Sequence, residues 1–294
     1  MPFRPVAVLL LTLSLALPLS AARRRAVRSP ALEPIEHVFV VILENTDADV
    51  AENLPFLSRL ASEGALLADY QSLTHPSQPN YIALAAGSTW GVDHDSVVTL
   101  DVPHLGDLLE NAHRTWRVYA ENYPGNCYLE SATADRLYVR RHVPFLEFKN
   151  VVSDPARCAS HVVDASVLDA DIATRALPSF ALYVPNQRNN GHDTTPGFAD
   201  AWLESRFGAL LKDSRFTRRT LFIVTFDESD SRDLRIWTLL WGTGVRQMVS
   251  TQRYDHYSLL RTIEELFGTG TLGQNDETAD PISDAIMSTA WSED

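Results

Sequence analysis

Short, almost continuously apolar runs recur along the chain and are its strongest structural signal. Runs of this kind, rich in valine, isoleucine or aromatic residues, predict strands that are covered on both faces. We expect such strands at 37–43, 64–70, 116–120, 180–184, 220–226 and 236–241. Segments with helical patterns lie between them, at 54–62, 81–86, 104–112, 164–175, 199–211 and 257–267. This alternation predicts an α/β fold with a mostly parallel central sheet and helices on both faces.

The first 22 residues have the layout of a secretory signal peptide, with Arg4, an apolar run over 6–19 and small residues at 20–22. The apolar run is too short to cross a bilayer comfortably. An uncleaved membrane anchor is the alternative, because the three arginines at 23–25 could act as a stop signal. We expect residues 23–34 to form a flexible Arg-rich lead-in, residues 35–294 to form a single domain, and the chain to be secreted or periplasmic.

The composition fits one large globular domain, since 45% of the 294 residues are hydrophobic. The formal net charge of −13 argues against a general nucleic-acid or anionic-membrane surface. No later segment is long and apolar enough for a membrane helix, so we expect no stable membrane insertion of the mature chain. The sequence leaves the oligomeric state open.

Cys127 and Cys158 are the only two cysteines. An oxidising compartment favours a disulfide between them, which would stabilise the fold by about 3 to 4 kcal/mol. Two buried free thiols are the alternative.

Polar pairs directly follow two of the expected strands. Glu44 and Asn45 follow the strand at 37–43, and Asp227 and Glu228 follow the strand at 220–226. The carboxyl ends of parallel strands line the ligand crevice of such a sheet. Carboxylate and amide oxygens suit Mg²⁺, Ca²⁺ or Mn²⁺, whereas the simpler interpretation is a set of solvated loops or helix caps.

The segment 75–81, HPSQPNY, leads from a loop into an expected helix. Ser77 then lies near the helix start, where unpaired N–H groups favour an anionic phosphate. An ordinary helix-capping serine is the alternative. A serine that also binds a metal can be ionised and attack phosphorus.

Two histidines stand beside aspartates, His192 next to Asp193 and His256 next to Asp255. An adjacent carboxylate can orient an imidazole for phosphate binding or proton transfer, although a loop histidine is more often simply exposed. His75 and His142 are weaker candidates.

Taken in order, seven short segments resemble the phosphoesterase family, which includes bacterial and fungal acid phosphatases and bacterial non-haemolytic phospholipases C. The segments are 44–45, 75–81, 119–122, 142–145, 189–193, 225–228 and 255–258. The resemblance implies an alkaline-phosphatase-like α/β fold, with residues 35–294 as the phosphoesterase catalytic domain. It implies a metal site formed by Glu44, Asn45, Ser77, Asp227 and Glu228, in which Zn²⁺ is a further possibility. It implies catalytic roles for Ser77, His192 and His256, and substrate contacts by Asn80, His75, His142 and Asp193.

The resulting hypothesis is a secreted, metal-dependent phosphomonoesterase of the acid phosphatase type that acts on phosphate esters through a phosphoseryl intermediate. The short HPSQPNY segment is more similar to the acid phosphatase branch than to the phospholipase branch. The alternatives are a phospholipase C-type phosphodiesterase and a non-catalytic phosphate- or metal-binding protein. A sulfatase would share the fold class, but no sequence context for formylglycine is apparent.

Overall fold

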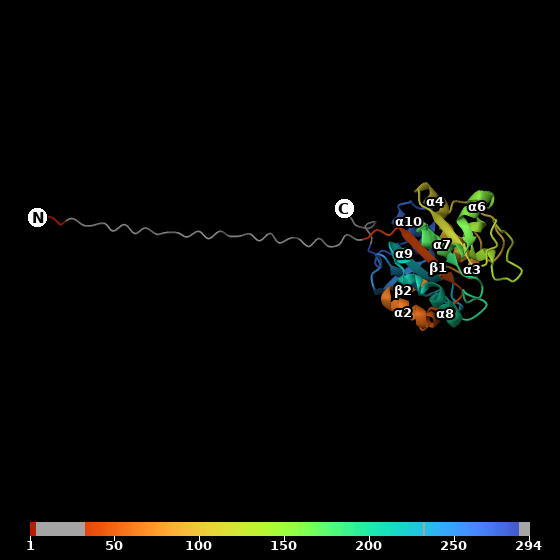
Figure 1. Ribbon diagram of the computed structural model, residues 1–294, viewed down its shortest axis with the longest axis horizontal. Helices are drawn as coiled ribbons and strands as arrows, with labels where there is room; N and C mark the ends of the chain where they lie inside the picture. The colour runs from red at the N-terminus through yellow and green to blue at the C-terminus, as the bar shows by residue number, and fades with distance from the viewer. Residues whose placement is uncertain (4–32, 232, 288–294) are drawn as a thin grey trace. The chain divides into compact units, whose positions relative to one another are not determined.

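The computed structural model describes residues 1–3, 33–231 and 233–287 (Figure 1). The expected signal peptide and most of the Arg-rich lead-in therefore lie outside the described residues. The chain divides into two units, residues 1–31 and 32–294, and every described helix and strand belongs to the second. The structure of that second unit follows.

Its centre is a sheet whose described strands lie in the order β4-β3-β5-β1-β6-β7-β2-β8. The strands are β1 (His37–Leu43), β2 (Ala65–Gln71), β3 (Trp116–Ala120), β4 (Val162–Asp164), β5 (Phe180–Val184), β6 (Thr220–Phe226), β7 (Thr238–Gly242) and β8 (Met248–Asp255). All neighbouring pairs are parallel except those of β7, which runs antiparallel to both β6 and β2. The predicted mostly parallel sheet is confirmed.

Helices cover both faces of this sheet (Figure 1). The α-helices are α1 (Ala48–Ala51), α2 (Pro55–Glu63), α3 (Ser77–Ala86), α4 (Leu105–Asn111), α5 (Lys149–Val152), α6 (Pro155–His161), α7 (Val167–Thr174), α8 (Pro196–Phe207), α9 (Ser214–Thr217) and α10 (His256–Phe267). Short 3₁₀ helices are η1 (Arg140–His142), η2 (Pro144–Glu147), η3 (Leu210–Lys212) and η4 (Asn275–Glu277). Helices α3, α4 and α10 pack together on one face, and α2 packs against α8 on the other.

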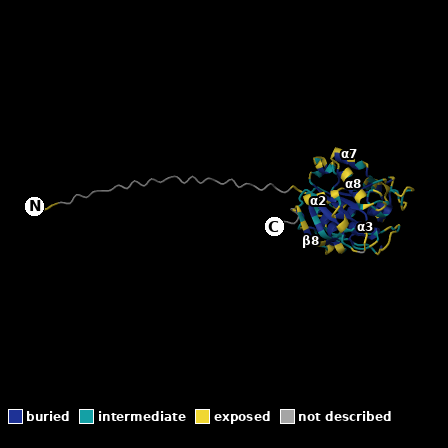
Figure 2. Ribbon diagram, turned by 90° about the horizontal axis from the view of Figure 1, so that it is seen from below, coloured by how far each residue is buried: buried dark blue, intermediate teal, exposed yellow. Residues whose placement is uncertain are grey.

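The two faces follow from the alternation of side chains along the strands. Phe39 of β1 stacks among aromatic rings from neighbouring strands and meets Phe207 of α8 and Phe216 of α9. Trp116 of β3 points to the other face and packs on Phe145. Figure 2 shows the result as buried strands, in dark blue, enclosed by partly exposed helices.

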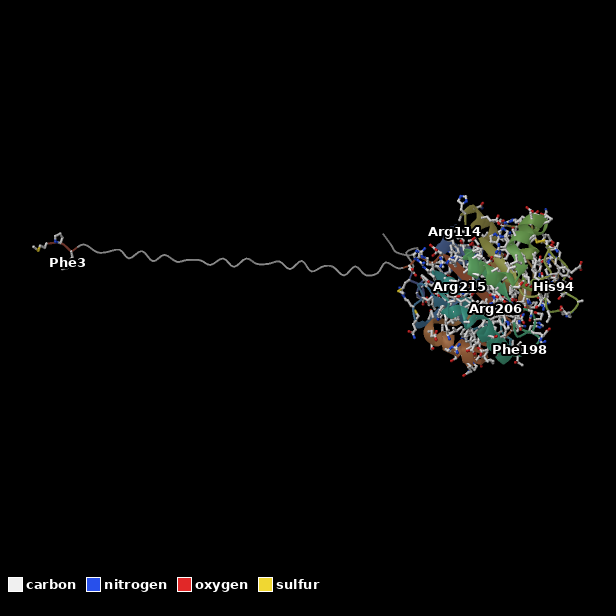
Figure 3. The ribbon with its side chains drawn as sticks, viewed as in Figure 1. Phe3, His94, Arg114, Phe198, Arg206 and Arg215 are labelled. Atoms are coloured by element: carbon white, nitrogen blue, oxygen red, sulfur yellow. A yellow bond between two sulfur atoms is a disulfide. The ribbon has the colours of Figure 1, made fainter. Side chains whose placement is uncertain are left out.

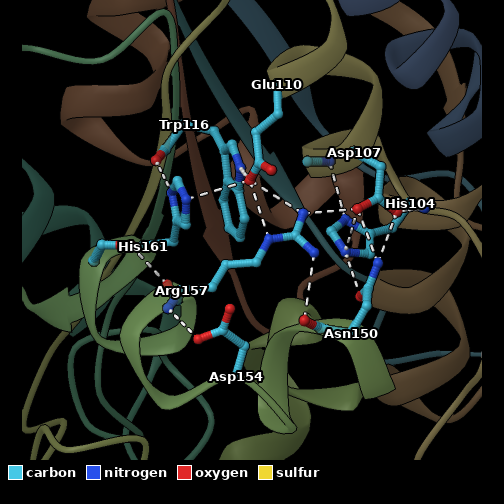
Figure 4. Close-up of polar contacts among 10 residues, drawn as sticks. His104, Asp107, Glu110, Trp116, Asn150, Asp154, Arg157 and His161 are labelled. Carbon is cyan, nitrogen blue, oxygen red and sulfur yellow. Dashed lines mark hydrogen bonds and ion pairs between the residues drawn. The ribbon is translucent and has the colours of Figure 1, made fainter.

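A disulfide joins Cys127 to Cys158, as predicted. Next to it along the chain, Arg157 binds the carboxylates of Asp107 and Glu110 at 2.7 and 3.1 Å (Figure 4). Because Arg157 belongs to α6 and both acids belong to α4, these charge-assisted contacts join the two helices. The histidines shown in Figure 4 are part of this structural network.

Among the described helices, none has the length and apolarity needed to cross a bilayer.

Glu264 is a buried carboxyl group on α10 whose ionisation opposes folding. Burial, followed by the nearby Asp276 carboxylate, raises its pKa from 4.5 to about 9. The folded state therefore holds a proton that the unfolded chain releases above its ordinary pKa. The protonated Glu264 carboxyl group contributes its full stabilisation of the folded state below pH 4.5. This stabilisation is lost as the pH rises towards 9.

We therefore expect Glu264→Gln to remove part of the alkaline loss of stability. The free energy of unfolding at pH 8 should rise by on the order of 2 kcal/mol relative to wild type, with little change at pH 4.5. Urea titrations at the two pH values measure this difference, with the exposed Glu63→Gln as the control. Equal pH dependence in wild type and Glu264→Gln would contradict the assignment.

Candidate active site

Two adjacent strands of the sheet bring the predicted acidic pairs together. Strands β1 and β6 are parallel neighbours, and Leu43 is aligned with Phe226. Glu44 and Asn45 therefore leave the sheet beside Asp227 and Glu228. The Asn45 backbone N–H donates to Asp227 Oδ1 at 3.3 Å. Because each polar pair directly follows its strand in the sequence, four of the five expected metal ligands lie together at one edge of the sheet.

Ser77 joins these residues from a third part of the chain. It is the first residue of α3, 4% exposed, and follows the loop after β2. Its hydroxyl lies 3.1 Å from Glu228 Oε1 and 3.2 Å from Glu44 Oε2, and donates towards these carboxylates. The helix begins after Pro76 without a side-chain cap, so Ser77 is not an ordinary capping serine.

The three carboxylates destabilise one another's charge. Burial, then the Asp227 charge, raises the Glu44 pKa well above its ordinary value. Burial, then Glu228, raises the pKa of Asp227 to about 7. Burial is also the main cause that raises the Glu228 pKa to about 7. Such a buried acidic cluster needs protons or a cation to offset its charge.

Unpartnered oxygens in this cluster fit a cation. Asn45 Oδ1 and Asp227 Oδ2 are buried and have no hydrogen-bond partner among the described residues. Within the described chain, histidine, cysteine, aspartate and glutamate alone do not form a three-ligand metal cluster. A divalent cation here would therefore draw on the Asn45 amide and the Ser77 hydroxyl as well as carboxylates, which is an oxygen set suited to Mg²⁺, Ca²⁺ or Mn²⁺.

His192 lies on the loop after β5 and lines a pocket of about 370 Å³ together with Asn45. Its Nδ1 atom is 2.8 Å from Asp193 Oδ1, so the aspartate orients the imidazole. The loop is tied to the cluster by the Glu44 N–H, which donates to the Asn190 carbonyl at 3.0 Å. His192 thus lines a pocket next to the expected metal ligand Asn45, and Asp193 lies beside its imidazole.

His142 is buried behind the carboxylates rather than exposed to a ligand. Its Nε2 atom lies 3.4 Å from Glu44 Oε2, and its ring stacks on Tyr81 with centroids 5.1 Å apart. Burial, followed by the charges of Arg141 and His192, lowers its pKa well below the ordinary value. His142 is therefore a neutral neighbour of Glu44 in this geometry.

Tyr81 is a site residue to which the sequence analysis gave no role. Its hydroxyl donates to Glu44 Oε1, and burial followed by the Glu44 charge raises its pKa well above the ordinary value. Tyr81 lies four residues after Ser77 on α3 and thus on the same helix face. This four-residue spacing from Ser77 is the sequence signal that could have identified Tyr81 as a site residue.

Asn80 has a different role from the expected substrate contact. Its Oδ1 atom accepts from the N–H groups of Leu73 and Thr74 at 2.9 and 3.3 Å. Its Nδ2 atom donates to the carbonyls of Thr74 and Pro76 at 2.8 and 3.3 Å. The amide is used at both ends to hold the loop before Ser77, which makes Asn80 a positioning residue.

His256 also departs from the expected catalytic role. It is 1% exposed, and its Nε2 atom lies 2.8 Å from the Asp227 carbonyl oxygen. Because a carbonyl only accepts, Nε2 carries the proton, and Nδ1 accepts from the Tyr70 hydroxyl at 3.2 Å. Both ring nitrogens are engaged, so this geometry makes His256 a support for Asp227 rather than a proton donor to a leaving group.

Three further polar or charged side chains lie around Ser77. His75 Nδ1 is 2.7 Å from Glu228 Oε2, which places His75 at the site as proposed from the sequence. Asp95 was not anticipated, although its carboxylate accepts from the Gln78 N–H and meets Arg141 Nε, both at 3.1 Å. The Arg141 charge lowers the pKa of both Glu44 and Glu228. No local sequence pattern singles out Asp95 or Arg141.

Comparisons with known proteins agree with this fold and identify the family. The crystal structure of a protein in the alkaline phosphatase superfamily from Vibrio parahaemolyticus has a TM-score of 0.58 at 12% identity, covering 83% of this chain and 70% of that one. A probable acid phosphatase of Kluyveromyces lactis is 33% identical over 257 residues, covering 83% of this chain and 61% of the yeast protein. The phosphatidylinositol-3-phosphatase of Mycobacterium tuberculosis is 32% identical over 260 residues, covering 86% and 84%.

The α/β fold is therefore like that of the Vibrio parahaemolyticus protein, as expected from the sequence. Residues 50–270 match the Phosphoesterase family, and the chain belongs to that family. The matches cover between 59% and 62% of the length of three fungal acid phosphatases.

Proposed function

We propose that the chain is a secreted, metal-dependent phosphomonoesterase in which Ser77 attacks phosphorus. The observation that carries the proposal is the meeting of three buried carboxylates, Glu44, Asp227 and Glu228, around one serine hydroxyl. A structural core has no use for such a cluster, because burying unpaired carboxylates costs free energy. Secretion is supported by the disulfide, which is typical of oxidising compartments.

The residues that would hold the cation are Glu44, Asn45, Ser77, Asp227 and Glu228. A bound divalent cation would lower the pKa of the serine hydroxyl and stabilise negative charge on the phosphoryl oxygens. Tyr81 and His256 then have positioning roles, since Tyr81 holds Glu44 through its hydroxyl and His256 holds Asp227 through the backbone.

The proposed reaction has two steps. Ser77 Oγ bonds to phosphorus as the bond to the leaving alcohol breaks, and the serine proton passes to Glu44 or Glu228, whose oxygens lie 3.2 and 3.1 Å away. Water then attacks the phosphoserine and gives a proton to the His192 imidazole that protonated the alcohol, while the proton held by the glutamate returns to Ser77 Oγ as phosphate is released. In-line attack needs the ester on the open side of the serine, opposite the carboxylates.

His192 is the proposed proton donor to the leaving alcohol. It is the histidine that lines the pocket beside Asn45, and Asp193 orients it through Nδ1. His256 is excluded from this role by its two existing hydrogen bonds. The Arg141 charge and the N–H donor of His75 would complement the substrate phosphate near the same carboxylates.

The lining of the pocket favours a small polar ester over a phospholipid diester. Apart from Val50 and Pro196, the lining consists of glycine and polar or charged residues: Asn45, Thr46, Asp47, Gly191, His192, Thr194 and Asp230. An acyl chain would find little apolar surface there. The names of the yeast and mycobacterial relatives, both phosphatases, point to monoesters as well.

The test is hydrolysis of para-nitrophenyl phosphate against para-nitrophenyl phosphorylcholine, across pH, after chelation and with divalent metals added back. We expect metal-restored turnover of the monoester, with kcat/KM at least about tenfold above that of the diester. Preference for the diester would support the phospholipase C alternative. Phosphate binding without turnover of either compound would support the binding-protein alternative.

A further inference from the structure

A second pocket lies at the opposite edge of the sheet, where β1, β5 and β6 begin. Its volume is about 310 Å³, and its lining is Glu36, His37, Arg175, Leu177, Ser214, Arg215, Arg218 and Arg219. His37 is the first residue of β1, and Arg219 directly precedes the first residue of β6. Because these strands are parallel, the pocket lies at the end of the sheet away from Glu44 and Asp227.

The charge of this pocket is opposite to that of the chain as a whole. Four arginines and one acidic residue, Glu36, line the pocket, in a protein with a formal net charge of −13. Clustering four cations around one cavity is unfavourable unless an anion offsets them. The pocket is therefore a part of the described surface that would attract an anionic ligand.

The ion pairs around the pocket leave several arginine donors unused. Arg215 is neutralised by Asp213 at 2.7 Å, and Arg219 binds Glu36 through Nη1 while its Nε atom is buried without a partner. Arg218 approaches Glu33 only to 3.9 Å, and both side chains are more than half exposed, so this pair contributes little. Arg175 makes no side-chain hydrogen bond or ion pair to any described residue.

Two of these arginines also occupy an unusual backbone conformation. Arg175 and Arg219 both have φ of +57°, in the left-handed region that favours glycine or asparagine. Strained positions of this kind concentrate at functional sites, where the side chain that they present outweighs their cost. The left-handed backbone thus occurs at two arginines of the lining that have unpaired side-chain donors.

We propose that this pocket binds a compact phosphorylated anion, held by Arg175, Arg218 and Arg219. Guanidinium groups match phosphate oxygens in bidentate geometry, which gives the class of ligand. Leu177 is the one apolar side chain of the lining, so a hydrophobic tail would gain little there. Binding is independent of catalysis, because the pocket and Ser77 lie at opposite ends of the strands.

A soluble anion fits this geometry better than an anionic membrane. The arginines line a hollow of about 310 Å³ rather than a flat face, a size at the lower limit of small-ligand pockets. A membrane held at this edge of the sheet would also face away from the residues around Ser77. Figure 3 labels Arg215, which is one of the residues that line the pocket.

The test is calorimetric titration of the full chain, freed of divalent cations, with methylenediphosphonate, a diphosphate analogue that is not hydrolysed. The variants are Arg175→Asn, Arg218→Gln and the double substitution. Asparagine is chosen at position 175 because it tolerates the left-handed backbone. The control is Arg253→Gln, which removes the same charge from an exposed position on β8.

We expect saturable binding to wild type, a loss of affinity of at least about tenfold in the double variant, and less than about twofold in the control. The kcat/KM for para-nitrophenyl phosphate should stay within about twofold of wild type in all of these variants. Equal affinity in wild type and the double variant, or no binding to wild type, would overturn the proposal. Arginine-dependent sedimentation with phosphatidylglycerol vesicles in the absence of diphosphonate binding would also overturn it, in favour of a membrane contact.

Discussion

Replacement of Ser77 by alanine is expected to lower kcat for para-nitrophenyl phosphate by at least about a thousandfold. Alanine keeps the helix start but removes the oxygen that lies between the Glu44 and Glu228 carboxylates. Since that oxygen is the proposed attacking atom, the reaction loses its covalent step rather than one contact among many. The measurement is kcat and KM with saturating metal, made on wild type and Ser77→Ala side by side.

Two controls accompany this prediction. Ser62→Ala removes a hydroxyl from the exposed surface of α2 and should leave kcat unchanged. Urea midpoints of both variants should stay near that of wild type, which shows that Ser77→Ala remains folded. Turnover by folded Ser77→Ala within tenfold of wild type would exclude the nucleophilic role.

Removal of the divalent cation is expected to have the second-largest effect, a fall in kcat/KM of more than about a hundredfold that added metal reverses. Without the cation, the buried carboxylates take up protons, because burial, assisted by the Glu228 charge at Asp227 and the Asp95 charge at Glu228, raises the pKa values of Asp227 and Glu228 to about 7. Chelation followed by titration with Mg²⁺, Ca²⁺, Mn²⁺ and Zn²⁺ measures the effect and ranks the metals.

The Asp227→Asn variant tests metal binding directly, without an activity measurement. The variant removes one carboxylate charge beside Asn45 and should weaken Mn²⁺ binding, measured by equilibrium dialysis, by about tenfold or more. Asp101→Asn, at an exposed ion pair with Lys149, is the matched control and should bind Mn²⁺ as wild type does. Wild-type Mn²⁺ affinity in Asp227→Asn would place the metal elsewhere.

The central strands could be predicted from the sequence because both of their faces are buried. The predicted bounds of β1, β3, β5 and β6 agree with the structure, and all four strands are made almost entirely of buried residues. Strand β8 was missed because it lies at the sheet edge and alternates buried Ser250 and Tyr254 with exposed polar residues. Strand β4 has three residues, too few to form a pattern.

Helix α3 shows a different limit of hydrophobic patterning. The prediction began at residue 81, but the helix begins at Ser77. Three of its first four residues, Ser-Gln-Pro-Asn, are polar yet buried, since they face the site and the preceding loop instead of solvent. A helix buried on all sides has no polar face to reveal its start.

The position of site residues was easier to predict than the direction of their side chains. Glu44 and Asp227 could be brought together because each directly follows a strand of one mostly parallel sheet, whereas Ser77 was joined to them only through the family resemblance. The directions of Asn80 and His256 depend on the backbone around them, and both side chains turn to support that backbone. The backbone conformation around Arg141 brings its side chain to the cluster, and no residue spacing in the sequence predicts this.

The most direct test of the central claim is to trap the covalent intermediate. Wild-type protein with bound metal is mixed with ³²P-labelled para-nitrophenyl phosphate, quenched in acid within milliseconds, and digested for peptide mapping by mass spectrometry. The account predicts one labelled peptide, with the phosphate on Ser77 and no label in Ser77→Ala. Rapid turnover with no labelled serine, or with label on another residue, would contradict it.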